Sequence, residues 1–197
     1  MKPIYNKIWK LAKPSYLKGR PYDVEHIKWL MKVVPKFLKD SELDMEILLP
    51  LVILHDVGYC KVKINAMKLE VRKAHMEEGA KIAKEILEKI DYPKEKADEI
   101  CRLISKHDNW AFGDSFGTEL YLQAFNNFDR MWVVNKKGFI SFQKLLNLDP
   151  AKTIRKIEED RKLDIKEGRI WVNKKVEEYY IKLLNKRKKE NEKGFLL

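Results

Sequence analysis

Hydrophobic positions recur along this chain with the spacing of α-helices. In the first clear segment, apolar residues fall on one helical face from Val24 to Leu38, and Asp23 stands where it can cap that helix. Similar apolar stripes predict helices over about residues 69–90, 94–107, 118–134, 150–163 and 172–191. No segment shows a convincing alternation with a period of two, which is the pattern of a half-buried strand. The periodicity therefore predicts an all-α fold.

The run from Ile47 to His55 differs from these stripes because it is almost entirely apolar. Ser41 and Asp44 precede it as a capping pair. Pro50 lies inside the run, so we expect a kink or a main-chain carbonyl left without its helical partner. The run is far shorter than the roughly 20 residues of a membrane helix, and its apolarity predicts a buried helix or strand.

Three segments between the predicted helices have the composition of loops. Residues 59–68 carry several lysines after Gly58, and residues 108–117 combine two glycines with three aromatic side chains, which indicates a mobile aromatic loop. Residues 136–138, Lys-Lys-Gly, are expected to break the helix before them. Asp149 and Pro150 then form a helix start, and residues 150–197 are expected to be a helical extension packed on the same core.

Composition narrows the class of protein. The chain of 197 residues has 45% hydrophobic and 36% charged residues, and its net charge is +11. A positive net charge favours an anionic partner. However, lysine and glutamate are both abundant, which is typical of the solvated ionic surface of a heat-adapted protein. The charge is therefore explained without nucleic acid, which is not the expected partner. Cys60 and Cys101 make no disulfide framework, and residues 1–20 contain no apolar stretch for a signal peptide. We expect a cytoplasmic protein.

The candidate chemistry lies in the four histidines and two of the aspartates. They are His26, His55, Asp56, His75, His107 and Asp129. A lone histidine is more often a core residue satisfied by a hydrogen bond, and Asp129 by itself would pair with Arg130. Together, imidazole nitrogens and carboxylate oxygens suit Mn, Fe, Co, Ni or Zn. Adjacent side chains on a helix diverge by about 100°, so His55 and Asp56 can share one metal only near a distorted helix end, unless the carboxylate lies between two metals.

The ordered set His26, His55-Asp56 and Asp129 resembles the HD-domain superfamily of metal-dependent phosphohydrolases. The likeness spans about residues 20–135 and includes the apolar helix before HDVG, similar to the superfamily's HDIG, and the arginine after Asp129, similar to its DADRL pattern. The resemblance implies one HD-type helical domain over 1–197, with a metal-site core at about 20–135. It also implies that these four side chains bind a divalent metal.

His75 and His107 extend the resemblance to the binuclear HD proteins. HMEEGAKIAKEIL is similar to their His-x-x-x-Gly helix, and LISKHDN to their fourth-histidine segment. In such proteins Asp56 would bridge two metals, with His75 and His107 on the second. The alternative is a site with one metal, in which these two histidines contact substrate or donate protons. We favour the binuclear arrangement.

The chain departs from the superfamily pattern at three places. Tyr59 stands where a lysine often follows HDIG, Asn127 replaces the first acid of DAD, and no GYP signature is present, which disfavours hydrolysis of cyclic dinucleotides. Substrate roles are therefore not transferred to those two positions.

The resemblance predicts hydrolysis of a phosphomonoester or nucleotide by a water that the metal activates. Asp56 would bind metal and orient that water, while Arg20, Lys61 and Arg72 are candidates for holding phosphate oxygens. Asp108 is a candidate general acid, and aromatic residues of the 108–117 loop are candidates for stacking a base. The alternative for each of the charged residues in this set is a solvated surface group without a role in the site. An oligomer is compatible with the sequence.

Two other function classes stay open at this point. HD-like proteins with four histidines and two aspartates also include di-iron oxygenases similar to myo-inositol oxygenase, which consume O₂. A regulatory or nucleic-acid-binding module would account for the charge of +11 and the lysine-rich end of the chain, but not for a complete ligand set.

Overall fold

The computed structural model describes residues 2–63, 68–169 and 171–194, which fold into α-helices joined by short turns. The helices are α1 (Pro3–Gly19), α2 (Asp23–Leu38), α3 (Met45–Leu54), α4 (Leu69–Glu88), α5 (Lys94–Ile104), α6 (Leu120–Met131), α7 (Lys136–Leu146), α8 (Pro150–Lys166) and α9 (Lys174–Glu192). Short 3-10 helices are η1 (Val57–Cys60), η2 (Asn109–Phe112) and η3 (Trp132–Val134). The described residues contain no strand, so the predicted all-α fold is confirmed.

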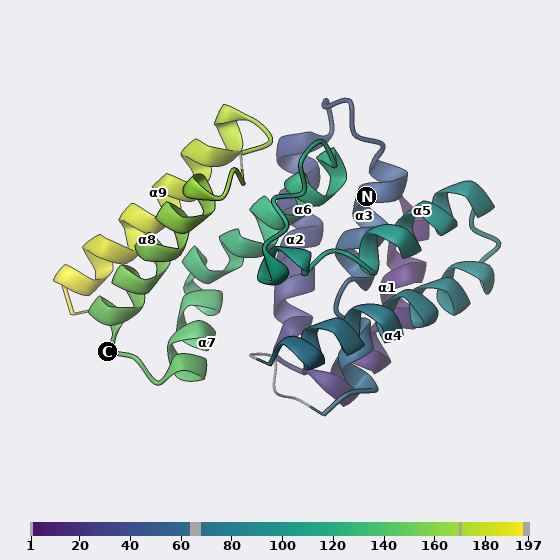
Figure 1. The fold of residues 1–197 in the computed structure, drawn as a ribbon, viewed down its shortest axis with the longest axis horizontal. Helices are drawn as coiled ribbons and strands as arrows, with labels where there is room; N and C mark the ends of the chain where they lie inside the picture. Colours follow the sequence, from purple (N-terminus) through teal and green to yellow (C-terminus); the bar gives the residue numbers. More distant parts are fainter. Residues whose placement is uncertain (1, 64–67, 170, 195–197) are drawn as a thin grey trace.

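Helix α3 is the centre of the core. Every residue from Leu48 to Leu54 is buried, which explains why its sequence is apolar all round rather than on one stripe. It contacts α1, α2, α5 and α6, and Figure 1 shows these helices around it. Helices α2 and α6, which carry His26 and Asp129, therefore pack on the same buried element.

Pro50 stays inside one continuous helix and frees a carbonyl, as the sequence predicts. The missing N–H of a proline leaves the carbonyl four residues earlier without its helical donor. That carbonyl belongs to Glu46, and the hydroxyl of Tyr92 donates to it at 2.6 Å. The proline thus creates a tertiary hydrogen bond between α3 and the turn before α5.

Two of the expected helix caps are confirmed and two are not. Asp44 accepts from the N–H of Glu46, and Asp149 accepts from that of Lys152. Asp23 is instead the first residue of α2, and its carboxylate turns toward Arg20. The hydroxyl of Ser41 donates to the carbonyl of Leu38, so it closes the preceding helix.

The sequence predicts that residues 136–138 break the preceding helix, and a break is found just before them. However, Asn135 caps a new helix there, α7. A Cβ on Gly138 would lie 1.9 Å from the carbonyl oxygen of Trp132. This glycine permits the close approach of two main-chain segments, which a sequence pattern does not distinguish from a helix breaker.

Helix α1 was not among the predicted elements. Lysines interrupt its sequence, yet Tyr5, Ile8, Ala12 and Tyr16 recur at helical spacing and are buried. The segments expected as loops at 59–68 and 108–117 each include residues of a 3-10 helix, η1 and η2 respectively. Residues 64–67 of the first loop lie outside the described residues.

Helices α8 and α9 form a pair at one end of the molecule, beyond α7 and opposite α1, α4 and α5 (Figure 1). They share the core, since Ile157, Val176 and Leu184 are buried. Asn127 of α6 accepts a hydrogen bond from the main-chain N–H of Val172, just before α9. No helix among the described residues has the length and apolarity to cross a bilayer.

Candidate metal centre

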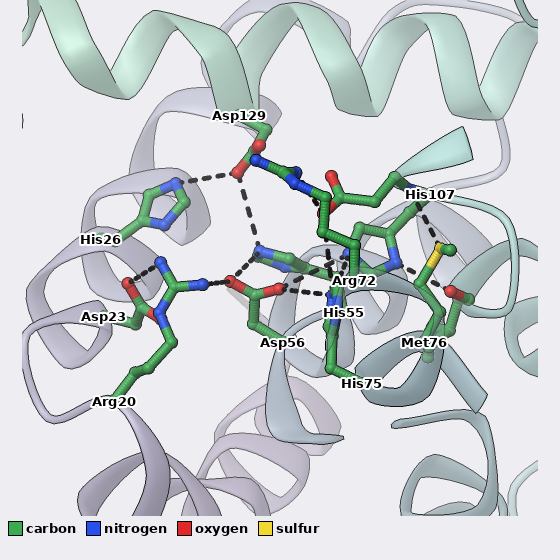
Figure 2. A network of polar contacts seen from close by, with 12 residues as sticks. Arg20, Asp23, His26, His55, Asp56, Arg72, His75, Met76, His107 and Asp129 are labelled. Carbon is green, nitrogen blue, oxygen red and sulfur yellow. Dashed lines mark hydrogen bonds and ion pairs between the residues drawn. The ribbon is translucent and has the colours of Figure 1, made fainter. Parts of the chain in front are cut away.

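The six side chains singled out in the sequence gather in two adjoining groups of three. His26, His55 and Asp129 form one group, and Asp56, His75 and His107 form the other. Within each group the potential ligand atoms lie within 4.8 Å of one another. Figure 2 shows the two groups side by side, with their side chains pointing toward one another.

In the first group, Asp129 faces two imidazoles. One of its carboxylate oxygens lies 3.3 Å from Nε2 of His26 and 3.6 Å from Nε2 of His55. The indole of Trp132 stacks on His26 with 5.1 Å between ring centres, and this contact helps to hold the imidazole in place. The side chain of Asp129 keeps 26% of its surface exposed, the most of the six, so this group lies on the side open to solvent.

Asp56 lies where the two groups meet (Figure 2). Its Oδ2 is 3.4 Å from Nε2 of His55, in the first group. Its Oδ1 is 3.3 Å from Nε2 of His75 and 3.5 Å from Nε2 of His107, in the second. A carboxylate whose two oxygens face two separate ligand groups has the placement of a bridging ligand.

The end of α3 explains how neighbouring residues can serve both groups. The helix ends at Leu54, and Asp56 leaves helical geometry with φ −102° and ψ 6° before η1 begins. The side chains of His55 and Asp56 can therefore converge, as the sequence argument required of a distorted helix end. Gly58 lets η1 lie directly against α4, because its Cβ position is 1.9 Å from the carbonyl oxygen of His75.

Main-chain carbonyls orient two of the imidazoles. Nδ1 of His55 lies 3.0 Å from the carbonyl oxygen of Val52, and Nδ1 of His107 lies 2.7 Å from that of Ile104. A proton on Nδ1 satisfies each contact and leaves Nε2 free to act as a ligand, as in known metal sites. Nε2 of His107 then lies 3.2 Å from Nε2 of His75, a pair that a shared cation would stabilise.

The electrostatics of the groups also favour a cation. Burial lowers the pKa of His26 well below its ordinary value, so this imidazole is neutral. Burial acts the same way on His55, but the carboxylates of Asp56 and Asp129 outweigh it and raise its pKa to about 9. The negative potential therefore holds a proton on His55. A divalent cation can take the place of that proton, so the residues present fit a metal ion.

Arg20 lies between Asp23 and Asp56 (Figure 2). Its Nε is 2.8 Å from a carboxylate oxygen of Asp23, and its Nη1 is 3.4 Å from Oδ2 of Asp56. Burial raises the pKa of Asp56, but His55 and Arg20 outweigh it and hold that pKa well below its usual value. Arg20, predicted to hold phosphate, thus already contacts two carboxylates. Asp23, absent from the predicted site, is its main partner.

Arg72 reaches the second group through Asp108. Its Nη1 donates to Asp108 at 2.7 Å, and that carboxylate lies 3.9 Å from Nε2 of His75. Burial opposes ionisation of Asp108, but His107 and Arg72 outweigh it and lower its pKa. Asp108 is therefore ionised at neutral pH, which disfavours its predicted role as a general acid.

The structure does not bring Lys61 to these groups. Its side chain is exposed at the end of η1, and its ammonium makes no hydrogen bond or ion pair within the described residues. Tyr59 packs there instead, stacked on His75 with 4.0 Å between ring centres, while the guanidinium of Arg20 lies 4.3 Å from its ring centre.

Comparison with known proteins agrees with this geometry. The family model described as "HD domain" matches residues 23–138, more than half of the chain. Neither the curated proteins nor the solved structures that were searched gave a match. The matched segment runs from the first residue of α2 to the first turn of α7 and contains all six side chains of the two groups. The chain belongs to the HD domain family.

Proposed function

We propose that this protein is a metal-dependent phosphohydrolase that cleaves a phosphomonoester or a nucleotide. The observation that carries the proposal is the placement of Asp56, whose two oxygens face two buried ligand groups. In this proposal His26, His55 and Asp129 hold one divalent transition metal ion, His75 and His107 hold a second, and Asp56 bridges them. Such ions lower the pKa of coordinated water and neutralise phosphoryl oxygens.

The chain's own residues would then orient the reactants. Asp56 positions the attacking water, and Arg20 holds that carboxylate in place from the side of Asp23. Arg72 adjoins the second group through Asp108 and can donate from its remaining N–H groups to a phosphate oxygen, since it uses one nitrogen on Asp108. The donors that Arg72 has left fit a phosphoryl substrate better than the neutral polyol of the oxygenase alternative.

A panel of phosphomonoesters and nucleotides tests this proposal. We expect hydrolysis that a chelator abolishes and added Mn²⁺ or Co²⁺ restores. Asp56→Asn should lower kcat by a factor of about 10³. Asp98→Asn, an exposed aspartate on α5, is the matched control and should keep parental activity. A silent panel together with O₂ consumption by the iron-loaded protein would replace the hydrolase with the oxygenase.

A further inference from the structure

Three arginine side chains surround the indole of Trp110. The guanidinium carbons of Arg130, Arg72 and Arg169 lie 4.3, 4.8 and 5.9 Å from its ring centre. Arg72 comes from α4 and Arg130 from α6, while Arg169 follows α8 in the C-terminal extension. The three are distant in sequence, so the tertiary fold alone creates this concentration of positive charge.

This arginine cluster adjoins the candidate metal centre through Asp108, which lies 3.9 Å from Nε2 of His75. The indole N–H of Trp110 donates to Asp108 at 2.9 Å, and Asp108 is the residue after His107. Arg130 is the residue after Asp129. A substrate phosphate on the two ligand groups would therefore have the cluster beside it. The guanidinium groups already lie over the indole, which argues against the predicted stacking of a base on Trp110.

Arg130 and Arg169 have unsatisfied hydrogen-bonding capacity. Both contact Asp164, and Arg169 also contacts Glu167. Even so, Nε of Arg130 and Nη1 of Arg169 are buried without a hydrogen-bond partner among the described residues. Burial lowers the pKa of Arg130. The carboxylate of Asp164 raises that pKa, and the positive charge of Arg169 lowers it further. Burying charged donors without acceptors is costly, and such groups call for an explanation such as a ligand.

There is also space beside Arg169. It lines an open cavity of about 320 Å³ whose other lining residues are Ile165, Trp171, Asn173, Lys174 and Glu177. Glu177 is paired there with Arg161, at 3.2 Å. Asn173 and Lys174 are at the start of α9, where main-chain N–H groups and the helix dipole favour an anion. Glu167, the second partner of Arg169, has 37% of its side chain exposed, so it can move to solvent when another anion takes its place.

We propose that Arg130 and Arg169 form an anion subsite for a second phosphoryl group, so that this protein prefers substrates with two phosphates over the matching monophosphates. The inference rests on the proposed function for the position of the first phosphate. Arginine suits this role because its planar fork of donors matches phosphate oxygens. The C-terminal extension would then supply part of the specificity of the HD core.

Matched pairs of substrates test the preference. Adenosine 5′-monophosphate is compared with adenosine 5′-diphosphate, whose second phosphate is adjacent, and with adenosine 3′,5′-bisphosphate, whose second phosphate is remote. For at least one pair, the ratio of kcat/KM should favour the doubly phosphorylated compound by about tenfold, the value of one charge-assisted hydrogen bond. Arg169→Gln should remove this preference for the doubly phosphorylated compound. Arg155→Gln, an exposed arginine on α8, is the matched control and should keep it.

A binding measurement separates this inference from the proposed function. Calorimetry on Mn²⁺-loaded protein compares methylenediphosphonate with methylphosphonate, neither of which turns over. Tighter binding of the diphosphonate that depends on Arg169 supports the subsite even if no phosphate ester is hydrolysed. If the ratio of the two phosphonate affinities is the same in the parent, Arg169→Gln and Arg155→Gln proteins, the proposed subsite is overturned, even if hydrolysis is observed. If Arg169→Gln does not fold, Arg169→Lys decides, because it keeps the charge but loses the fork and should lower the ratio about threefold.

Discussion

A hydrogen bond at Nδ1 determines which nitrogen of His55 and His107 is available at the candidate metal centre. In both residues the acceptor is the carbonyl three residues earlier, so the local helix end sets the orientation of the ring. Stacking sets the ring orientation of the other two histidines, because Trp132 packs on His26 and Tyr59 packs on His75. Rings held in place before a metal arrives lose little entropy on binding it.

Metal counting on alanine variants tests the division into two groups. We expect two ions in the parent, one in the His75→Ala and His107→Ala proteins, and one in the His26→Ala and Asp129→Ala proteins. Asp56→Ala should lose both, because two neighbouring cations repel strongly without a shared carboxylate. Elemental analysis of protein purified without a histidine tag measures this. One ion per chain in the parent, unchanged by His75→Ala or His107→Ala, would establish the alternative with a single metal.

At the scale of elements, the contact between η1 and α4 brings Asp56 and His75 together. A Cβ on Gly58 would lie 1.9 Å from the carbonyl oxygen of His75 and 2.6 Å from the main-chain nitrogen of Gly79. Both obstacles are main-chain atoms, so no side-chain rotation relieves the clash. The position requires glycine for close approach.

We expect Gly58→Ala to lower the free energy of unfolding by about 3 kcal/mol or more, the upper end of overpacking effects. Gly79→Ala is the matched control, because its Cβ would meet its nearest neighbours at 3.3 Å and alanine improves helix propensity. That variant should lose about 1 kcal/mol or less. Urea denaturation followed by circular dichroism compares the two, and equal losses would contradict the role given to Gly58.

Glu46 joins three helices through its carboxylate. Its Oε1 lies 2.6 Å from Nζ of Lys2, at the start of α1, and its Oε2 lies 2.5 Å from Nζ of Lys96 on α5. Hydrogen bonds from Lys2 and Lys96 lower the pKa of Glu46 to about 2. A carboxylate with a depressed pKa in the folded state stabilises the fold at higher pH and loses that contribution as pH falls.

Glu46→Gln should therefore be less stable than the parent above about pH 5, and the difference should disappear as pH falls to about 2. The side chain is 35% exposed, so solvent screening limits the difference to about 1 kcal/mol or less. Glu77→Gln, an exposed glutamate on α4, is the control. Thermal melts across this pH range measure the effect, and a difference that persists unchanged at the lowest pH would refute the assignment.

At the scale of the whole molecule, the α8–α9 pair is part of the same core as the metal centre. Val176 and Leu184 are buried, and Tyr179 of α9 packs on Phe37 of α2 with 4.7 Å between ring centres. Because these contacts join the extension to α2, which carries His26, we expect the chain to unfold as one unit.

Leu184→Ala tests that expectation. It should lower the free energy of unfolding by about 2–4 kcal/mol, the usual cost of a large-to-small change in a core. Leu163→Ala, an exposed leucine of α8, should change it little. Far-ultraviolet circular dichroism and tryptophan fluorescence should report one coincident transition in both variants. Two separated transitions in Leu184→Ala would show that the extension is an independent unit.

The sequence by itself determined the class of fold and the chemistry of the candidate ligands. Helical periodicity is a local property, so the stripes of α2, α4, α5, α6, α8 and α9 were predictable, as was the all-round apolarity of α3. Residue type also fixes which metals a histidine–aspartate set suits. Helix α1 escaped prediction because its lysines obscure the buried stripe, and α7 because Gly138 resembles a breaker.

Only the tertiary structure decided which of those residues meet. The sorting of six side chains into two groups depends on how α2, α3, α4, α5 and α6 pack together, and no short sequence window contains that information. Long-range packing also exposed Lys61, brought Arg20 to Asp56 and brought Arg169 to Trp110. The reason is physical: secondary structure follows from neighbours along the chain, whereas a site follows from burial of surfaces far apart in sequence.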